Sequence, residues 1–160
     1  MKVVVPEIGL LVRSATAADC AFVLALADRL ASFEVPVWRS RGELIEGDRR
    51  ALQEWFDNPK ADEAIFVAEL DGQAAGCAFL VTLVDYFNQR PHAHLSVLAV
   101  TAAAEGRGVG SALLDRCADW ARERKSDRLT LSALVTNARA RRLYERRGFG
   151  GEYVRYVLPL

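Results

Sequence analysis

The sequence predicts an α/β (α+β) fold in which a mixed central sheet carries helices on both faces. Three observations favour this class. Short segments rich in apolar and β-branched residues alternate with segments whose apolar residues repeat at helical spacing. Asp71-Gly72 separates two such strands and is a strong signal for a hairpin turn. Another strand, at residues 93–100, leads through a glycine-rich loop into a long amphipathic helix.

The elements follow one another without a linker or repeat, and we expect one domain over residues 1–160. Thr16 can cap the first helix, and Asn58-Pro59 ends the second because proline disfavours helical geometry in the residue before it. We expect irregular chain at 32–47 and 85–92. The expected strands are 8–13, 64–70, 73–84, 93–100, 128–134 and 152–158, and the expected helices are 17–31, 48–57, a long helix from Val109, and 138–147.

Residues 105–111, with the sequence E-G-R-G-V-G-S, form the loop that opens the long helix. Glycine lets the backbone approach a ligand closely and adopt positive φ. The unpaired N–H groups and the positive dipole end of a helix N-terminus attract phosphate. A helix-starting loop without a ligand is the other interpretation. On the first interpretation a pyrophosphate binds the backbone amides of Gly106, Arg107, Gly108, Val109, Gly110 and Ser111.

The spacing of these glycines argues against two common nucleotide-binding loops. A dinucleotide fold needs G-x-G-x-x-G in a tight turn, whereas this loop reads G-x-G-x-G and four residues separate Val100 from Glu105. A P-loop needs G-K-[ST], and Gly110-Ser111 carries no lysine.

A second motif lies at residues 137–149, N-A-R-A-R-R-L-Y-E-R-R-G-F. It matches every fixed position of N-x-x-A-x-x-L-Y-x-x-x-G-F, so the chain resembles the GNAT superfamily of acyl-CoA-dependent N-acyltransferases. The family's loop reads [QR]-x-x-G-x-[GA]; Gly108 and Gly110 match it, but Glu105 stands where Gln or Arg is usual. The resemblance implies a GNAT-like, mostly antiparallel central sheet flanked by helices on both faces, with acetyl-CoA as cosubstrate.

The resemblance also implies roles for residues around both motifs. The strand backbone at residues 98–100 would pair with the pantetheine amides, and an N–H there would serve as an oxyanion donor. Tyr144 would protonate the leaving thiolate, because a phenol with a pKa near ~10 stays protonated at neutral pH. A half-buried helix tyrosine and a simple helix cap at Asn137 are the alternatives. The implied cofactor-binding residues beyond the loop are Leu98, Ala99, Val100, Asn137, Ala140 and Tyr144.

The general base is less defined, and His94 is the first candidate. It lies six residues before Val100, where some GNAT enzymes place a catalytic glutamate, and histidine titrates near neutral pH. In an unbulged strand it shares a face with Val100; a bulge, which the family often has there, would reverse that. A packed histidine without a catalytic role is the alternative, and His92, Asp85 and Glu69 are the other candidates for the base.

Charge separates the two parts of the chain. Residues 1–100 hold 9 basic and 14 acidic side chains (−5), and residues 101–160 hold 12 and 7 (+5). A basic part fits an anionic cofactor and an acidic part fits a cationic acceptor, although solvated helix faces give the same counts. Glu34 is a candidate contact for a cationic acceptor, and the loop aromatics expected near its entrance are Phe33, Trp38, Tyr86 and Phe87.

Several classes of partner are not expected. The arginines of residues 139–147 are scattered around one short helix, which does not favour a nucleic acid. No apolar run reaches the ~18 residues of a membrane span. The N-terminal apolar run is too short for a signal peptide, and three distant cysteines without metal-ligand spacing suit reduced thiols, so we expect a cytoplasmic protein with no metal.

The sequence therefore predicts an acetyl-CoA-dependent N-acetyltransferase. It would move acetyl to a primary amine of a small molecule or peptide by direct attack in a ternary complex. A non-catalytic CoA-binding or regulatory domain of the same fold is the alternative, and the intact motifs around Gly108 and Tyr144 favour the enzyme. Family members often dimerise, so we expect a homodimer, its mode unspecified.

Overall fold

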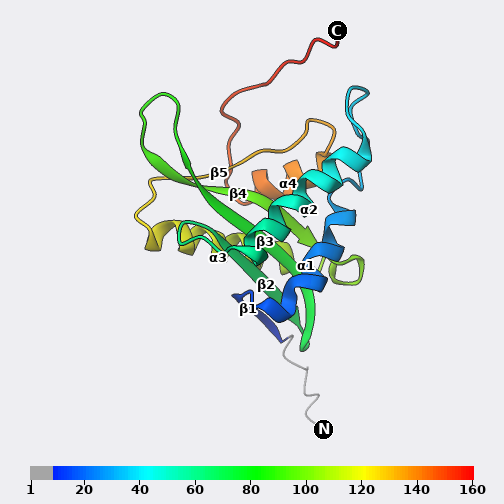
Figure 1. The fold of residues 1–160 in the computed structure, drawn as a ribbon, viewed down its shortest axis with the longest axis vertical. Coiled ribbons are helices and arrows are strands. Elements are labelled where there is room, and N and C mark those ends of the chain that lie inside the picture. The colour runs from blue at the N-terminus through cyan, green and yellow to red at the C-terminus, as the bar shows by residue number, and fades with distance from the viewer. Residues whose placement is uncertain (1–8) are drawn as a thin grey trace.

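A five-stranded sheet forms the centre of the protein in a computed structural model that describes residues 9–160 (Figure 1). The strand order is β1-β2-β3-β4-β5. Strands β1 to β4 pair with one another in antiparallel fashion, and β5 runs parallel to β4. The strands are β1 (Leu10–Ser14), β2 (Ala64–Leu70), β3 (Gln73–Val84), β4 (Pro91–Val100) and β5 (Leu129–Leu131).

Helices cover both faces of this sheet, as the sequence predicts (Figure 1). One face packs against α1 (Cys20–Leu26) and α2 (Arg41–Asp57) around buried Val23 and Leu52. The other face packs against α3 (Val109–Glu123) around buried Leu113, with α4 (Ala138–Arg146) beside it through Leu143. The expected fold class, a mixed and mostly antiparallel sheet between two helical layers, is confirmed.

The second helix is longer than expected, because it begins at Arg41 rather than at residue 48. Ser40 and Glu43 form a capping box: Glu43 N–H donates to Ser40 Oγ at 3.1 Å, and Ser40 N–H donates to Glu43 Oε2 at 3.1 Å. Gly42 and Gly47 favoured an irregular segment in the sequence, but both sit in open positions along the helix. The cap, together with the packing of α2 through buried Leu52, offsets the low helix propensity of the two glycines.

The first expected helix, residues 17–31, is divided into three pieces. A short 3₁₀ turn, Ala17–Asp19, precedes α1, and a second, Ala27–Arg29, follows it. Asp19 anchors the beginning, because its carboxylate accepts two hydrogen bonds from Arg13 of β1 at 2.8 and 2.9 Å. The second turn brings Arg29 to the end of β4.

Strand β4 contains a bulge at Ser96. Val97 pairs with Phe79 of β3 and Leu95 pairs with Leu80, so Ser96 has no partner residue in the register. The extra residue reverses the alternation of side chains along the strand. His94 therefore shares its face with residues 97 and 99 rather than with residues 98 and 100. Of the two expectations for the face on which His94 lies, the one that assumed a bulged strand is confirmed.

The expected last strand, residues 152–158, is wrong for the chain taken alone. Residues 150–160 form no strand and every one of them is exposed, and β5 spans Leu129–Leu131 instead of 128–134. Tyrosine and valine favour strands, but a strand also needs a neighbour to accept its ladder hydrogen bonds. The first strand fits its prediction within two residues, apart from residue 8, which lies outside the described residues.

Within residues 9–160 the longest helix, α2, has 17 residues, and none of the helices there is both long and apolar enough for a membrane crossing.

Candidate active site

A cavity of about 460 Å³ opens beside the C-terminal half of β4. Strand β5 pairs with β4 only at residues 93–95, so the edge of β4 beyond the bulge has no strand beside it among the described residues. Leu98, Ala99 and Val100 line the cavity there. Backbone N–H and C=O groups on such an edge are available to an extended ligand.

The glycine loop forms the second wall of this cavity. Gly106 and Gly108 have φ of +73° and +84°, a conformation that L side chains rarely adopt, and no atom lies within 4 Å of a Cβ built on either. Gly108 is the N-cap residue of α3, so the first amides of that helix face this loop region. A cradle of this kind, open and free of side chains, fits a phosphate group.

Gly110 serves packing between helices instead. A Cβ there would meet Leu143 Cδ2 of α4 at 3.4 Å. The glycine therefore lets α4 lie close to the beginning of α3.

Helix α4 supplies the third wall. Asn137 caps it, with Ala140 N–H donating to Asn137 Oδ1 at 3.2 Å, and both residues line the cavity together with Tyr144. Tyr144 is half-buried, and its ring meets Phe149 edge-on at 5.8 Å. Burial, with a smaller effect of the nearby Cys117 thiol, raises the pKa of Tyr144. Its hydroxyl therefore keeps its proton at neutral pH.

Three arginines that the sequence analysis did not assign to cofactor binding also line this cavity: Arg29, Arg139 and Arg146. Glu105 connects the first two. Arg139 Nη1 lies 2.7 Å from Glu105 Oε1, and Arg29 forms an ion pair with the same oxygen. Arg29 Nε also donates to Val100 O at 2.8 Å. The hydrogen bond from Arg139 is the main reason that the pKa of Glu105 is lowered. Glu105 thus occupies two cations that an anionic ligand would otherwise meet.

The structure brings together most of the expected cofactor-binding residues. Arg107 is the exception: its guanidinium donates to Asp71 Oδ2 at 2.9 Å in the β2–β3 turn and does not line the cavity. The residues that do line it are Leu98, Ala99, Val100, Gly106, Gly108, Val109, Gly110, Ser111, Asn137, Ala140 and Tyr144.

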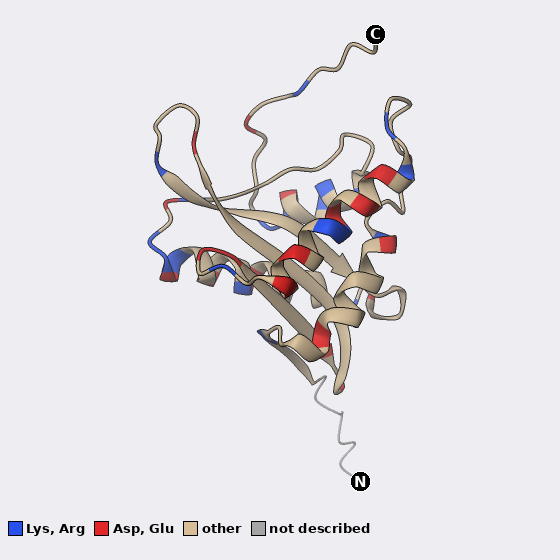
Figure 2. Cartoon of the chain, viewed as in Figure 1, with Lys and Arg blue, Asp and Glu red and all other residues tan. Residues whose placement is uncertain are grey.

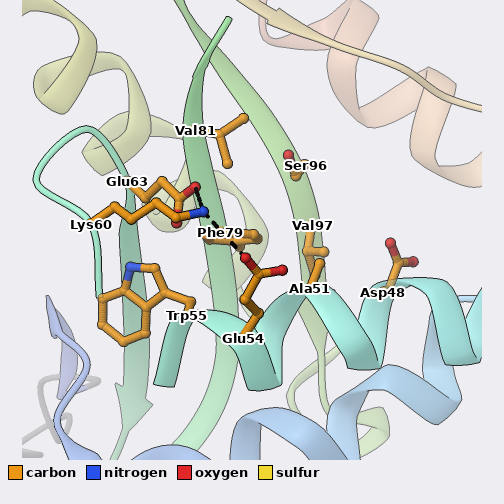
Figure 3. A pocket seen from close by; sticks show the side chains of 10 residues that line it. All are labelled: Asp48, Ala51, Glu54, Trp55, Lys60, Glu63, Phe79, Val81, Ser96 and Val97. Atoms are coloured by element: carbon orange, nitrogen blue, oxygen red, sulfur yellow. Dashed lines mark hydrogen bonds and ion pairs between the residues drawn. The ribbon is translucent and has the colours of Figure 1, made fainter. Parts of the chain in front are cut away.

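A second cavity, of about 190 Å³, lies between α2 and strands β3 and β4 (Figure 3). Asp48 and Glu54 of α2 and Glu63 before β2 give it an acidic lining. Lys60 Nζ lies 3.4 Å from Glu54 Oε1 and 3.4 Å from Glu63 Oε1, and Figure 3 shows this pair of contacts at the end of the cavity away from Asp48. Three carboxylates against one ammonium leave the lining negative.

Two polar groups of the second cavity lack partners. Desolvation raises the pKa of Asp48, whose half-buried carboxylate has no cation beside it in the described cavity lining except the distant Lys60 (Figure 3). The buried indole Nε1 of Trp55 has no hydrogen-bond acceptor among the described residues. Sequence reasoning missed Asp48, Glu54 and Glu63, which look like ordinary surface charges in the printed sequence.

The two cavities adjoin along β4. Ser96 and Val97 line the second, and Leu98, Ala99 and Val100 line the first. The change from one lining to the other therefore falls between Val97 and Leu98, shortly after the bulge at Ser96.

The expected base candidates lie outside both linings. His94 Nδ1 is 2.8 Å from Thr130 Oγ1 of β5, and burial, with the nearby His92, lowers the pKa of His94. His92 is buried, and its Nδ1 has no partner within residues 9–160. Asp85 accepts hydrogen bonds in its own turn and from Arg128 at 2.7 Å, and Glu69 accepts one from Arg13 at 2.7 Å.

The remaining expected residues are also absent from both linings. Phe33, Glu34, Trp38, Tyr86 and Phe87 line neither of them. Cys77 and Cys117 are buried, and burial raises the pKa of each thiol to about 12, so neither is a nucleophile at neutral pH.

Comparisons with known proteins give the family. The profile of the Acetyltransferase (GNAT) family matches residues 27–149. A mycothiol acetyltransferase of Beutenbergia cavernae is 37% identical over 100 residues, which are 62% of this chain and 31% of the relative; the matched region is thus about a third of that protein.

Solved structures agree in fold. An aminoglycoside N-acetyltransferase, AAC(6')-Iy, in complex with CoA superposes with a TM-score of 0.76 at 19% identity, covering 98% of this chain and 99% of that one. A ribosomal-protein-alanine N-acetyltransferase of Brucella melitensis superposes with a TM-score of 0.70 at 19% identity, covering 95% and 99%. With the family profile covering most of its length, this chain belongs to the GNAT acetyltransferase family.

Proposed function

We propose that the protein transfers acetyl from acetyl-CoA to a primary amine of a small molecule or peptide, by direct attack in a ternary complex. One observation carries this proposal: the glycine loop, the unpaired edge of β4 and Tyr144 line one cavity, and an acidic cavity adjoins it along the same strand. A thioester held in the first cavity would meet an amine held in the second near the bulge at Ser96.

In the first cavity the pyrophosphate would bind the amides of residue 106 and residues 108–111, since the N–H of Arg107 donates to Ala104 O. The positive-φ glycines and the N-terminus of α3 support this placement. The pantetheine would run along residues 98–100 and add to the edge of β4 as a short strand does. Arg139 and Arg29 would approach the phosphates as their contacts with Glu105 loosen.

The chemistry then needs a proton donor for the thiolate. As the amine attacks the thioester carbon, the carbonyl oxygen gains negative charge, which a backbone N–H of β4 near the bulge would stabilise. Collapse of the tetrahedral intermediate breaks the C–S bond. Tyr144 would donate its proton to the departing sulfur, and the raised pKa of its hydroxyl keeps that proton available.

The amine must also lose a proton. At a pKa near ~10.4 a lysine-like amine costs about 4–5 kcal/mol to deprotonate at pH 7, so a base matters most for such acceptors. In the second cavity, Asp48 is the carboxylate whose pKa is raised. We propose it as the first candidate for the base that accepts this proton. His94 is the second candidate; because it lines neither cavity, it would act through water.

The acidic lining also favours a cationic acceptor. Asp48, Glu54 and Glu63 would attract an ammonium group, and Lys60 between two of them marks how such a group is held (Figure 3). Helix α2 carries five acidic and three basic side chains, whereas α4 carries four arginines and one glutamate (Figure 2).

The test is an acceptor screen with acetyl-CoA and detection of released thiol. Polyamines, aminoglycosides, amino acids and peptide N-termini form the panel. We expect acceptor-dependent thiol release with at least one amine, and N-acetylated product by mass spectrometry. CoA binding with no turnover on any class would instead support the non-catalytic CoA-binding domain.

A further inference from the structure

The end of the second cavity that lies away from Asp48 holds an ammonium group of the protein itself. Lys60 Nζ lies 3.4 Å from Glu54 Oε1 and 3.4 Å from Glu63 Oε1 (Figure 3). Hydrogen bonds between an ammonium and a carboxylate are usually about 2.7–2.9 Å long, so neither carboxylate holds Lys60 closely. The two carboxylates still favour the charged form of Lys60 and raise its pKa. A cation is therefore held at this end of the cavity, but loosely.

The backbone that carries Lys60 is fixed, whereas its side chain is free to move. In the turn between α2 and β2, Asp62 O accepts a hydrogen bond from Thr82 Oγ1 of β3 at 3.0 Å. Ala61 O accepts one from Arg124, at the end of α3, at 2.7 Å. The Lys60 side chain is 46% exposed. It can therefore swing into solvent without any rearrangement of the turn.

A buried hydrogen-bond donor lies at the same end of the cavity. The indole Nε1 of Trp55 is enclosed and has no acceptor among the described residues. Its ring meets Phe56 edge-on at 5.1 Å, and Figure 3 shows its nitrogen on the edge of the ring that is turned toward the Lys60 side chain. An unpaired buried donor destabilises a fold, so its presence calls for an explanation. An oxygen of a ligand, admitted when Lys60 moves, would supply the missing acceptor.

From these observations we infer that Lys60 and Trp55 form an anchoring subsite for the end of the acceptor that does not react. An ammonium group of the acceptor takes the place of Lys60 Nζ between Glu54 and Glu63. An oxygen close to that ammonium accepts the N–H of Trp55. The chemical class of the acceptor is thus a diamine or polyamine that carries an amino alcohol group. The inference rests on the proposed function only in taking the second cavity as the acceptor site.

The position of the subsite sets the size of the acceptor. Asp48 and Glu54 are six residues apart on α2, which corresponds to about 9 Å along the helix axis. Figure 3 shows Asp48 and Ser96 on the other side of the cavity from Trp55, and Ser96 lies on the strand that the first cavity adjoins. The reacting amine and the anchored ammonium are therefore separate nitrogens of one acceptor. A monoamine that reacts beside Asp48 leaves Lys60 in place.

The first test follows the indole N–H of Trp55 by NMR, in the absence of acetyl-CoA. The chain has three tryptophans and hence three indole resonances, and Trp55→Phe identifies the one from Trp55. The probes are ethanolamine and propylamine at equal ionic strength, because they differ only by a hydroxyl in place of a methyl group. Ethanolamine should shift the Trp55 resonance with a Kd in the millimolar range, and propylamine should bind at least about tenfold more weakly. An unmoved Trp55 resonance, or equal affinity for the two probes, would overturn the inference.

The second test examines displacement of the lysine. Lys60→Met removes the ammonium and keeps a long side chain, so ethanolamine should bind this variant about 2- to 5-fold more tightly than the wild type. The matched control is Lys125→Met, which changes the net charge by the same amount in the turn after α3 and should leave the affinity unchanged. The indole resonances of the other two tryptophans show that each variant is folded. Equal affinity in the two variants would contradict displacement.

Neither test uses turnover, so the subsite and the proposed reaction can fail separately. Turnover of amines without a shift of the Trp55 resonance would overturn the anchoring subsite alone. A shift of that resonance without turnover on any amine would overturn the proposed reaction alone.

Discussion

The two cavities that adjoin along β4 are built in different ways. The first uses backbone and glycine: an open strand edge, positive-φ loop residues and a helix N-terminus. The second uses side chains, chiefly the carboxylates Asp48, Glu54 and Glu63. Backbone recognition needs particular glycines at particular spacing and so leaves a motif. Side-chain recognition needs only charges in the right place, which many sequences provide.

Under the proposed function, the first cavity carries the steps common to all acceptors and the second cavity selects the acceptor. Substitutions in the first should therefore affect every acceptor alike. Substitutions in the second should affect acceptors according to their charge and amine pKa. Four predictions test this division and a fifth concerns stability; the first has the largest expected effect and the last has the smallest.

Replacing Tyr144 with phenylalanine should lower kcat by about 100- to 10,000-fold, the usual cost of losing a general acid. The ring stays, so packing against Phe149 and acetyl-CoA affinity should change little. The loss should appear in kcat with KM nearly constant, and be the same for amines of low and high pKa. The control is Tyr86→Phe, at a tyrosine 83% exposed in the β3–β4 hairpin. Wild-type kcat in Tyr144→Phe would remove the acid role.

Replacing Gly108 with glutamate should weaken CoA binding by about 10- to 100-fold. The side chain is strained at φ of +84°, and its charge opposes phosphate at the N-terminus of α3. Gly72→Glu is the matched control, since Gly72 has φ of +79°, equally open space and a place in the β2–β3 turn. Calorimetry should find normal CoA affinity in the control. Equal affinity in both variants would contradict the pyrophosphate placement.

The difference between the two cavities also explains which features could be predicted from the sequence. The hairpin at Asp71-Gly72, the loop around Gly108 and the cap at Asn137 are local features, and local chemistry fixes their geometry. These features were enough to predict the sheet, the first cavity and the family resemblance.

The features that could not be predicted depend on contacts between segments that are distant in the sequence. Arg29 meets Glu105 across 76 positions, and nothing around it in the sequence marks that contact. The bulge at Ser96 turns His94 to the other face, and it arises from pairing with β3. The start of α2 was readable from Ser40 and Glu43, but Gly42 and Gly47 obscured it.

The third prediction concerns the base and compares Asp48→Asn with His94→Ala. If Asp48 accepts the proton, Asp48→Asn should lower kcat/KM by about 100-fold for amines of high pKa, less for α-amines, and remove the acidic limb of the pH–rate profile. If His94 acts through water, His94→Ala should instead lower kcat/KM in this way and remove the acidic limb. An acidic limb unchanged in both variants would leave the proton to bulk water or to another group.

Stability gives an independent check on Asp48. Burial raises its pKa, so the folded state binds that proton more tightly than the unfolded state. Its contribution to stability is therefore favourable at low pH and is lost as pH rises through the raised pKa. At neutral pH Asp48→Asn should raise Tm while lowering activity, as expected where a functional group is held at a cost to stability. A lower Tm would show that the carboxylate is held by structural contacts.

The smallest expected effect is at Glu105, where this chain departs from the family loop. Glu105→Gln removes a negative charge beside the phosphate cradle and releases Arg139 and Arg29 from an ion pair. Because these charge interactions are exposed to solvent, the effect is small, and CoA should bind about 2- to 5-fold more tightly. The gain should shrink at high salt, because screening weakens the interaction of exposed charges.

The matched control for that variant is Glu123→Gln, which also breaks an arginine contact, to Arg116 at 3.0 Å, but lies at the far end of α3. Calorimetry at low and high salt should show an effect only at Glu105. Weaker CoA binding in Glu105→Gln would mean that the carboxylate positions the two arginines for the phosphates rather than competing for them. Glu105 would then take over the function of the Gln or Arg that is usual in the family. The first cavity would depend on side chains more than its glycines indicate.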